Sequence, residues 1–291
     1  MKIKFGPAGT NLAFSTNKKN KMIMFPAYLA QSNLNALEYQ CGHGIRISTE
    51  SAKLFGEECK KNSIFLSIHS PYYISLSSTE AKKRENSVNY ILQTAILAKT
   101  MNAKRIVIHS GSCAKISRAE ALNLAKQTLT DSLNTLKENN LSDIILCPEV
   151  MGKINQLGTL QEVIELCKIQ ENILPCIDFG HLNARLFGAL NTLDDYKSIF
   201  FEIENSLGEY RLKNMHIHFS KIEYTKPGGE KCHLTFSDEK YGPQFEPLAN
   251  LLVQKSATPV IICESAGTQV EDAVTMQTIY QKILQKNNNQ F

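Results

Sequence analysis

Eight short apolar runs rich in β-branched residues recur along this chain, and helix-like segments separate them. The runs occupy residues 2–6, 36–41, 64–69, 105–109, 144–149, 174–179, 214–219 and 260–264. Near-continuous apolar strands that alternate with amphipathic helices are typical of a parallel sheet covered by helices. The count of eight predicts a single-domain α/β protein, a closed (β/α)8 TIM barrel. An open, doubly wound sheet is the structural alternative.

The segments between the runs carry helix signals. Ser117 with Glu120, and Thr159 with Glu162, have the spacing of capping boxes at helix starts. We expect one barrel domain over residues 1–285 and a frayed polar tail at 286–291. In one segment the apolar residues at helical spacing are Val88, Ile91, Leu92, Ala95 and Ile96.

Composition sets broad limits on the class of protein. With 43% hydrophobic and 21% charged residues, the 291-residue chain is globular, which excludes disordered and fibrous classes. The net charge of +4 permits a polyanionic partner without requiring one. No stretch approaches the ~18 apolar residues of a membrane helix, and the first residues lack a secretory signal, so we expect a cytoplasmic protein with no membrane partner. The eight scattered cysteines form no CxxC pair, so we expect reduced thiols.

Histidines and carboxylates gather where the predicted strands end. In a barrel of this type the active site lies at the carboxyl ends of the strands. Five of the seven histidines lie there, and a sixth, His233, lies in the loop after the seventh strand. Only the first and second strands end without a metal-ligand type. The donors at the other strand ends are His69, His109, Glu149, Asp178, His181, His216, His218 and Glu264.

This donor set predicts a metal centre. Carboxylates that converge in a partly dry cavity need charge compensation, which a divalent cation supplies. Histidine and carboxylate ligands without cysteine suit Zn²⁺, and also Mn²⁺ or Fe²⁺, and the donors exceed the ~4 that one tetrahedral ion needs. We therefore expect two or three ions. Paired ions hydrolyse phosphate esters, but metal sites on this fold also support sugar isomerisation, so the donor chemistry leaves both reactions open.

Six ordered motifs at the strand ends resemble one known family. They are SIHSPYY at 67–73, VIHSG at 107–111, PEVMGK at 148–153, CIDFGHLNAR at 176–185, MHIHFSK at 215–221 and ESAG at 264–267. Together they resemble the endonuclease IV type of apurinic/apyrimidinic endonuclease, within the xylose isomerase-like barrel superfamily. The resemblance runs along nearly the whole chain.

The resemblance implies three zinc ions. The first would be held by His69, His109 and Glu149. The second would be held by Glu149 as a bridge, with Asp178, His216 and Glu264. The third would take His181 and His233.

The sequence departs from the family at the third ion. The family commonly has an aspartate two residues before the last histidine, where this chain has Lys231. Glu230, one residue earlier, is either the substitute ligand or a solvated loop carboxylate, and Cys232 is a weaker substitute. His218 also departs from the usual pattern, and a supporting or substrate-binding role remains open for it.

The resemblance implies hydrolysis of the phosphodiester 5′ to an abasic site in duplex DNA, by a monomer. Glu149 and Glu264 would be the catalytic carboxylates, with Glu264 orienting the nucleophile. Two rival hypotheses remain: a sugar isomerase or epimerase of the same superfamily, and a protein that binds metal or damaged DNA without turnover. The expected DNA contacts are Tyr72 and Tyr73 at the lesion, and Lys153, Arg185 and Lys221 at phosphates.

Overall fold

The computed structural model describes residues 2–289 and has a strand at each of the eight predicted positions. All eight are short, and each ends within one residue of the end of its sequence run. They are β1 (Lys4–Pro7), β2 (Ala36–Gln40), β3 (Phe65–His69), β4 (Arg105–Ile108), β5 (Ile145–Pro148), β6 (Cys176–Asp178), β7 (His216–Phe219) and β10 (Val260–Cys263).

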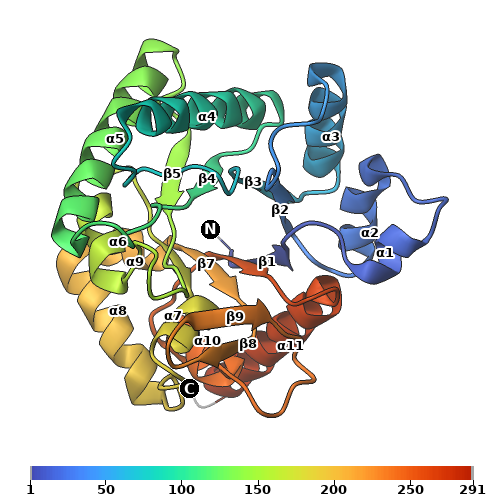
Figure 1. The fold of residues 1–291 in the computed structure, drawn as a ribbon. Helices are drawn as coiled ribbons and strands as arrows, with labels where there is room; N and C mark the ends of the chain where they lie inside the picture. The colour runs from blue at the N-terminus through green and yellow to red at the C-terminus, as the bar shows by residue number, and fades with distance from the viewer. Residues whose placement is uncertain (1, 290–291) are drawn as a thin grey trace.

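These strands form a closed parallel barrel. One half has the order β2-β3-β4-β5 and the other β1-β10-β7-β6, and every pairing within each half is parallel. Two isolated parallel bridges join the halves, Ala8 with Glu38 and Glu149 with Cys176. Figure 1 shows the strands at the centre and the helices around them. The predicted TIM barrel is therefore confirmed, and the open sheet is excluded.

Helices cover the outside of the barrel, and a small hairpin is added after β7. The hairpin consists of the antiparallel strands β8 (Ile222–Thr225) and β9 (Gly229–His233). The longer helices are α3 (Thr49–Lys61), α4 (Ala81–Thr100), α5 (Arg118–Glu138), α6 (Leu160–Cys167), α8 (Leu193–Leu207), α10 (Phe245–Gln254) and α11 (Gln269–Asn288). The shorter ones are α1 (Leu12–Thr16), η1 (Met22–Met24), α2 (Phe25–Gln31), α7 (Phe179–Arg185) and α9 (Glu209–Lys213).

The predicted helix starts are confirmed. Ser117 and Thr159 are N-caps, and each forms a complete capping box with the glutamate three residues later. The buried face of α4 differs from the predicted one, because Ile96 is 50% exposed while Thr94 and Ala98 are buried. A helix of small and polar residues can bury those against its neighbours, so the apolar residues alone did not mark the inner face.

The predicted frayed tail begins too early. Helix α11 continues through Asn288, so residues 286–288 are helical, and residues 290–291 lie outside the described part of the chain. Tyr280 and Ile283 pack against the core and hold the last turns of this helix. Within residues 2–289, no helix combines the length and apolarity needed to cross a membrane.

Closure of the barrel between β1 and β2 depends on a close backbone approach at Gly6. The amide of Asn35 donates to the carbonyl of Phe5 at 3.0 Å, and that of Gly9 to the carbonyl of Glu38 at 2.9 Å. A Cβ atom on Gly6 would lie 1.8 Å from the Ala36 carbonyl oxygen, which is backbone and cannot move aside. Only glycine fits at this junction.

We therefore expect Gly6→Ala to lower the free energy of unfolding by about 3 kcal/mol, because the added methyl group forces β1 and β2 apart. Urea unfolding followed by circular dichroism measures the loss. Gly228→Ala is the control, since its Cβ would meet only the Thr225 hydroxyl, at 3.1 Å. Equal free energies of unfolding for the two variants would show that the β1–β2 junction can accommodate a methyl group at residue 6.

Candidate metal centre

The carboxyl ends of the strands surround a cavity of ≈ 400 Å³. Its lining comes from β3, from the residues after β4, β5 and β10, from α7, and from the hairpin strand β9. The ionisable lining residues are His69, Tyr72, His109, Glu149, Lys153, His181, Glu230, His233 and Glu264. The parallel register of the barrel thus brings distant parts of the sequence to one rim.

Glu149 lies at the centre of this rim. Its carboxylate is 1% exposed, and four imidazole nitrogens lie 3.1 to 3.3 Å from it, those of His69, His109, His181 and His218. Burial raises the pKa of this carboxyl, but the surrounding imidazoles, His218 foremost, outweigh burial and hold the pKa well below its usual range. An ionised carboxylate among several imidazoles is suited to bridging two cations.

The first group of donors is His69, His109 and Glu149, whose ligand atoms lie within 4.8 Å of one another. Nδ1 of His69 contacts the Ser70 carbonyl oxygen at 2.8 Å, which leaves Nε2 facing Glu149 at 3.3 Å. Metal-bound histidines usually donate the other ring N–H to a carbonyl or carboxylate in this way.

The second group is Glu149, Asp178, His218 and Glu264, again within 4.8 Å. Asp178 caps α7 through Oδ1, which accepts from the His181 amide at 2.7 Å, and its buried Oδ2 has no hydrogen-bond partner among the described residues. Burial raises the pKa of Glu264 to about 8, and the nearby carboxylates add to the effect while His218 opposes it. A bound cation would offset this crowding of carboxylates.

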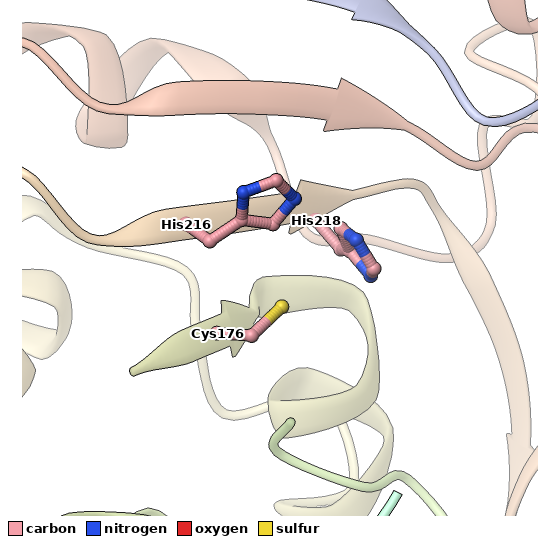
Figure 2. A group of neighbouring side chains, drawn as sticks. All are labelled: Cys176, His216 and His218. Carbon is pink, nitrogen blue, oxygen red and sulfur yellow. The ribbon is translucent and has the colours of Figure 1, made fainter. Parts of the chain in front are cut away.

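The two histidines of β7 differ from the sequence-based assignment. The resemblance implies His216 as a ligand of the second ion, but the structure places His218 in the second group. His216 lies one inward-facing position earlier, with Nε2 2.9 Å from the carboxylate of Glu38. Figure 2 shows both rings on the same side of β7, above Cys176 of β6. Alternate strand residues face the same side, so the motif could not reveal which histidine reaches the rim.

The third group is His181, Glu230 and His233. Glu230 Oε2 lies 3.4 Å from His181 Nε2, and the Ser220 hydroxyl contacts His233 Nδ1 at 2.8 Å. The hairpin register shifts by one residue here, and Lys231 turns outward to pair with Glu223 at 2.7 Å. Glu230 could be a substitute ligand or a solvated loop carboxylate, and the structure places it beside the two histidines. The exposed Cys232 instead contacts Glu223.

The two predicted lesion-contacting tyrosines are both about half exposed, but only Tyr72 lines the cavity. Tyr72 and Tyr73 are 54% and 50% exposed. The Tyr72 ring stacks on His109, with 5.7 Å between centroids, and Tyr73 packs edge-on against Tyr90 at 4.6 Å. Both therefore combine a fixed ring position with an open face.

Of the three predicted phosphate contacts, only Lys153 lines the cavity. Arg185 donates to the backbone carbonyls of Met151, Lys153 and Gln156. The amino group of Lys221 donates to the carbonyls of Phe236 and Asp238. Through these contacts the two cations brace the loops around the cavity.

Glu38 is the residue that sequence reasoning missed. The second strand does not end in a metal-ligand residue. Glu38 nevertheless lies in the middle of β2, fully buried inside the barrel. Burial raises the pKa of this carboxyl, but the imidazoles of His216 and His218 outweigh burial and hold the pKa well below its usual range. The sequence signal that could have revealed Glu38 is a carboxylate between Leu37 and Tyr39 within a predicted strand.

Comparison with known proteins links this chain to relatives of two kinds. Residues 26–281 match the family model described as a xylose isomerase-like TIM barrel. The chain is 34% identical over 284 residues to an uncharacterized protein of Methanocaldococcus jannaschii, covering 96% of this chain and 97% of that one. It is 30% identical over 159 residues to the "Probable endonuclease 4" of Mycoplasma pneumoniae, covering 53% of this chain and 52% of that protein.

Solved structures with this fold include enzymes of different reactions. A D-tagatose 3-epimerase-like protein has a TM-score of 0.71 and 19% identity, with 99% of both chains covered. Endonuclease IV from Thermus thermophilus has a TM-score of 0.67 and 16% identity, with 97% of this chain and 99% of that chain covered. At these identities the likeness establishes the barrel fold alone.

We expect Glu230→Ala to lower the number of bound metal ions by one, because the third group would keep only two imidazoles. Elemental analysis of protein purified without chelator measures the stoichiometry. Glu223→Ala is a matched control on the facing strand, since that carboxylate pairs with Lys231 and points away from the cavity. Unchanged metal content in Glu230→Ala would mean that Glu230 is only a loop carboxylate.

Proposed function

The chain belongs to the xylose isomerase-like TIM barrel family, and we propose that it is a metal-dependent apurinic/apyrimidinic endonuclease. Its substrate would be duplex DNA that contains an abasic site, and it would hydrolyse the phosphodiester 5′ to that site. The relatives named "Probable endonuclease 4" support this proposal. The described chain alone supplies all three donor groups, which fits action as a monomer.

The observation that carries the proposal is the presence of three adjoining donor groups. Glu149 belongs to both the first and the second group. His181 joins the second to the third, because its Nδ1 lies 3.1 Å from Asp178 and its Nε2 lies 3.4 Å from Glu230. Phosphodiester hydrolysis uses several adjacent cations, one set near the nucleophile and the other near the leaving oxygen. An isomerase would need only one or two ions.

The residues divide into holding and reacting roles. Zn²⁺ suits the donor set, and Mn²⁺ or Fe²⁺ would also fit; bound ions would lower the pKa of water and neutralise phosphate charge. Glu149 holds the first two positions together. Glu264, whose pKa is about 8 in the absence of a cation, lies at the mouth side of the second group and orients the attacking water. Both carboxylates are therefore proposed as catalytic.

The rim residues would recognise the lesion. Tyr72 lines the cavity and Tyr73 follows it in the chain, and both rings are about half exposed, so bases next to an abasic gap can stack on them. Lys153 lines the same cavity and would contact a phosphate. An abasic nucleotide is the easiest to turn out of a duplex, because no base has to be unpaired.

An epimerase is the second candidate, and one observation favours it. The second group alone supplies four donors, which is a complete site for one ion. The D-tagatose 3-epimerase-like structure shares the fold but not, at 19% identity, an assignable activity. The third group and the exposed tyrosines have no evident use in a single-ion sugar site, so we favour the nuclease.

We expect Glu264→Gln and Glu149→Gln to reduce cleavage of an abasic duplex by about 10³-fold or more, because each removes a charge that acts at the reacting phosphate. The assay uses a labelled oligonucleotide duplex with one abasic site, beside an intact duplex of the same sequence. Glu223→Gln should cleave like the parent protein.

The parent protein decides between the candidates in the same assay. Cleavage next to the abasic site supports the nuclease. Epimerisation of ketohexoses with no cleavage would establish the sugar enzyme instead. Tight abasic-duplex binding without cleavage in excess zinc would identify a binding protein.

We expect Tyr72→Ala and Tyr73→Ala each to weaken binding of the abasic duplex by about 10-fold, the loss of one stacking contact. The metal content of both variants should equal that of the parent protein. This control shows that the loss of binding comes from lost stacking and not from displacement of His109, on which Tyr72 packs. Tyr210→Ala is the control, because Tyr210 is 65% exposed on α9, outside the rim. Fluorescence anisotropy with a catalytically inactive background measures the affinity, and unchanged affinity would assign the tyrosines to packing alone.

A further inference from the structure

Glu38 lies below the metal centre, in the interior of the barrel. It is 0% exposed, and three side chains from other strands approach its carboxylate. The Ser67 hydroxyl of β3 donates to Oε2 at 3.0 Å. His216 Nε2 lies 2.9 Å from Oε2, and His218 Nε2 lies 3.1 Å from Oε1. A buried carboxylate with such partners has a defined task, because burying it without them would be costly.

The carboxylate determines where the imidazoles keep their protons. An ionised carboxylate only accepts hydrogen bonds, so each ring presents its Nε2–H to Glu38. Both Nε2 atoms lie at hydrogen-bonding distance from the carboxylate, 2.9 Å for His216 and 3.1 Å for His218. The Nε2 of His218 has no hydrogen bond of good geometry among the described residues, and Glu38 is an acceptor 3.1 Å away.

The opposite side of the His218 ring faces the second group. Its Nδ1 lies 3.2 Å from Glu149 Oε1 and 3.5 Å from Glu264 Oε1. When Nε2 keeps its proton, Nδ1 of the neutral ring carries a lone pair. A lone pair directed at two carboxylate oxygens is repulsive unless a cation lies between them, and it is the correct electronic form for a metal ligand.

We propose that Glu38 is a positioning residue for the metal centre: it holds the Nε2 proton of His218 so that Nδ1 is offered to the second ion. Carboxylate partners of this kind fix the tautomer and orientation of metal-bound histidines. Glu38 touches no reacting atom in this arrangement. It acts through His218, and His216 and Ser67 hold the carboxylate in place. This inference rests on the metal centre of the proposed function, but not on DNA as the substrate.

The Cys176 thiol also lies beside the two histidines, with its sulfur within 4.8 Å of a ring nitrogen of each (Figure 2). Its thiol is fully buried, and burial raises its pKa well above the usual range, so it is a neutral neighbour. It lies beside the same rings but cannot take over the role of the carboxylate. This makes Cys176 a matched control for disturbance of the barrel interior.

The first test measures metal affinity on the full chain. Zn²⁺ binding is followed by competition with a chromophoric chelator for the parent protein, Glu38→Gln and Cys176→Ser. We expect Glu38→Gln to weaken one zinc equivalent by about 10-fold to 100-fold and to leave the others within about 3-fold. Cys176→Ser should match the parent protein. Equal zinc affinities of Glu38→Gln and the parent, or a larger loss in Cys176→Ser, would overturn the proposal.

The second test examines the His218 ring in the zinc-loaded protein. ¹⁵N and ¹H chemical shifts should report zinc on Nδ1 and a strongly hydrogen-bonded proton on Nε2 in the parent protein, and that hydrogen bond should weaken in Glu38→Gln. Glu38→Asp keeps the charge and should recover part of the zinc affinity, and it also serves if Glu38→Gln fails to fold. A chemical shift of the Nε2 proton that is unchanged in Glu38→Gln would refute the inference. Failure of the parent protein to cleave abasic DNA would instead refute only the proposed function.

Discussion

The contact of four imidazoles with the Glu149 carboxylate is the interaction on which the rest of the rim depends. The imidazoles come from the ends of β3, β4 and β7 and from α7, and Glu149 itself follows β5. The closed parallel barrel brings these five positions to one point, because all carboxyl ends lie on the same side and the strands surround a common axis. A slip of one residue in a strand would turn its donor to the opposite face. The strand register therefore determines which donors face the site.

The same constraint explains the polar column inside the barrel. Glu38, His218 and Glu149 follow one another from the interior to the rim, so acidic acceptors alternate with an imidazole that has one nitrogen for each. Small apolar side chains of the barrel interior, such as Val107 and Cys147, pack around this column and exclude water from it. In such surroundings an unpaired charge is expensive. The column is stable because each polar group faces a complementary one, and the carboxylate excess at the rim is what a cation would offset.

The sequence was sufficient for the barrel but only partly for the rim. Apolar runs and capping boxes are local signals, and they located all eight barrel strands and two helix starts, but the hairpin strands β8 and β9 lie outside the predicted runs. The choice between His216 and His218 needed the height of each residue along β7, which differs by one inward-facing position and leaves no trace in the motif. The contacts of Arg185 are unpredictable for a related reason: its partners are loop carbonyls, and loop conformation is not encoded in residue type.

Glu38 does not lie at a strand end, where metal ligands of this fold are expected, but points inward from the middle of β2. Whether a side chain of a strand points into the barrel depends on the strand register, and the sequence alone does not give that register. The polar residues at the end of α11 resemble a frayed tail in sequence. They are helical through Asn288 because Ile283 anchors the preceding turn in the core.

The hairpin β8–β9 separates the proposed nuclease from a simpler barrel enzyme. Without it, the rim would keep the first two groups, since Glu230 and His233 both belong to β9. The hairpin is held over the rim by a bridge between Lys153 and Gly229, and it fits there because Gly152 has no side chain. A Cβ at that position would lie 2.6 Å from the Glu230 Cβ and 3.0 Å from the His181 ring. The third group thus depends on one close approach between a strand-end loop and an added hairpin, which is how a barrel suited to one ion could acquire the further donors of a phosphodiesterase.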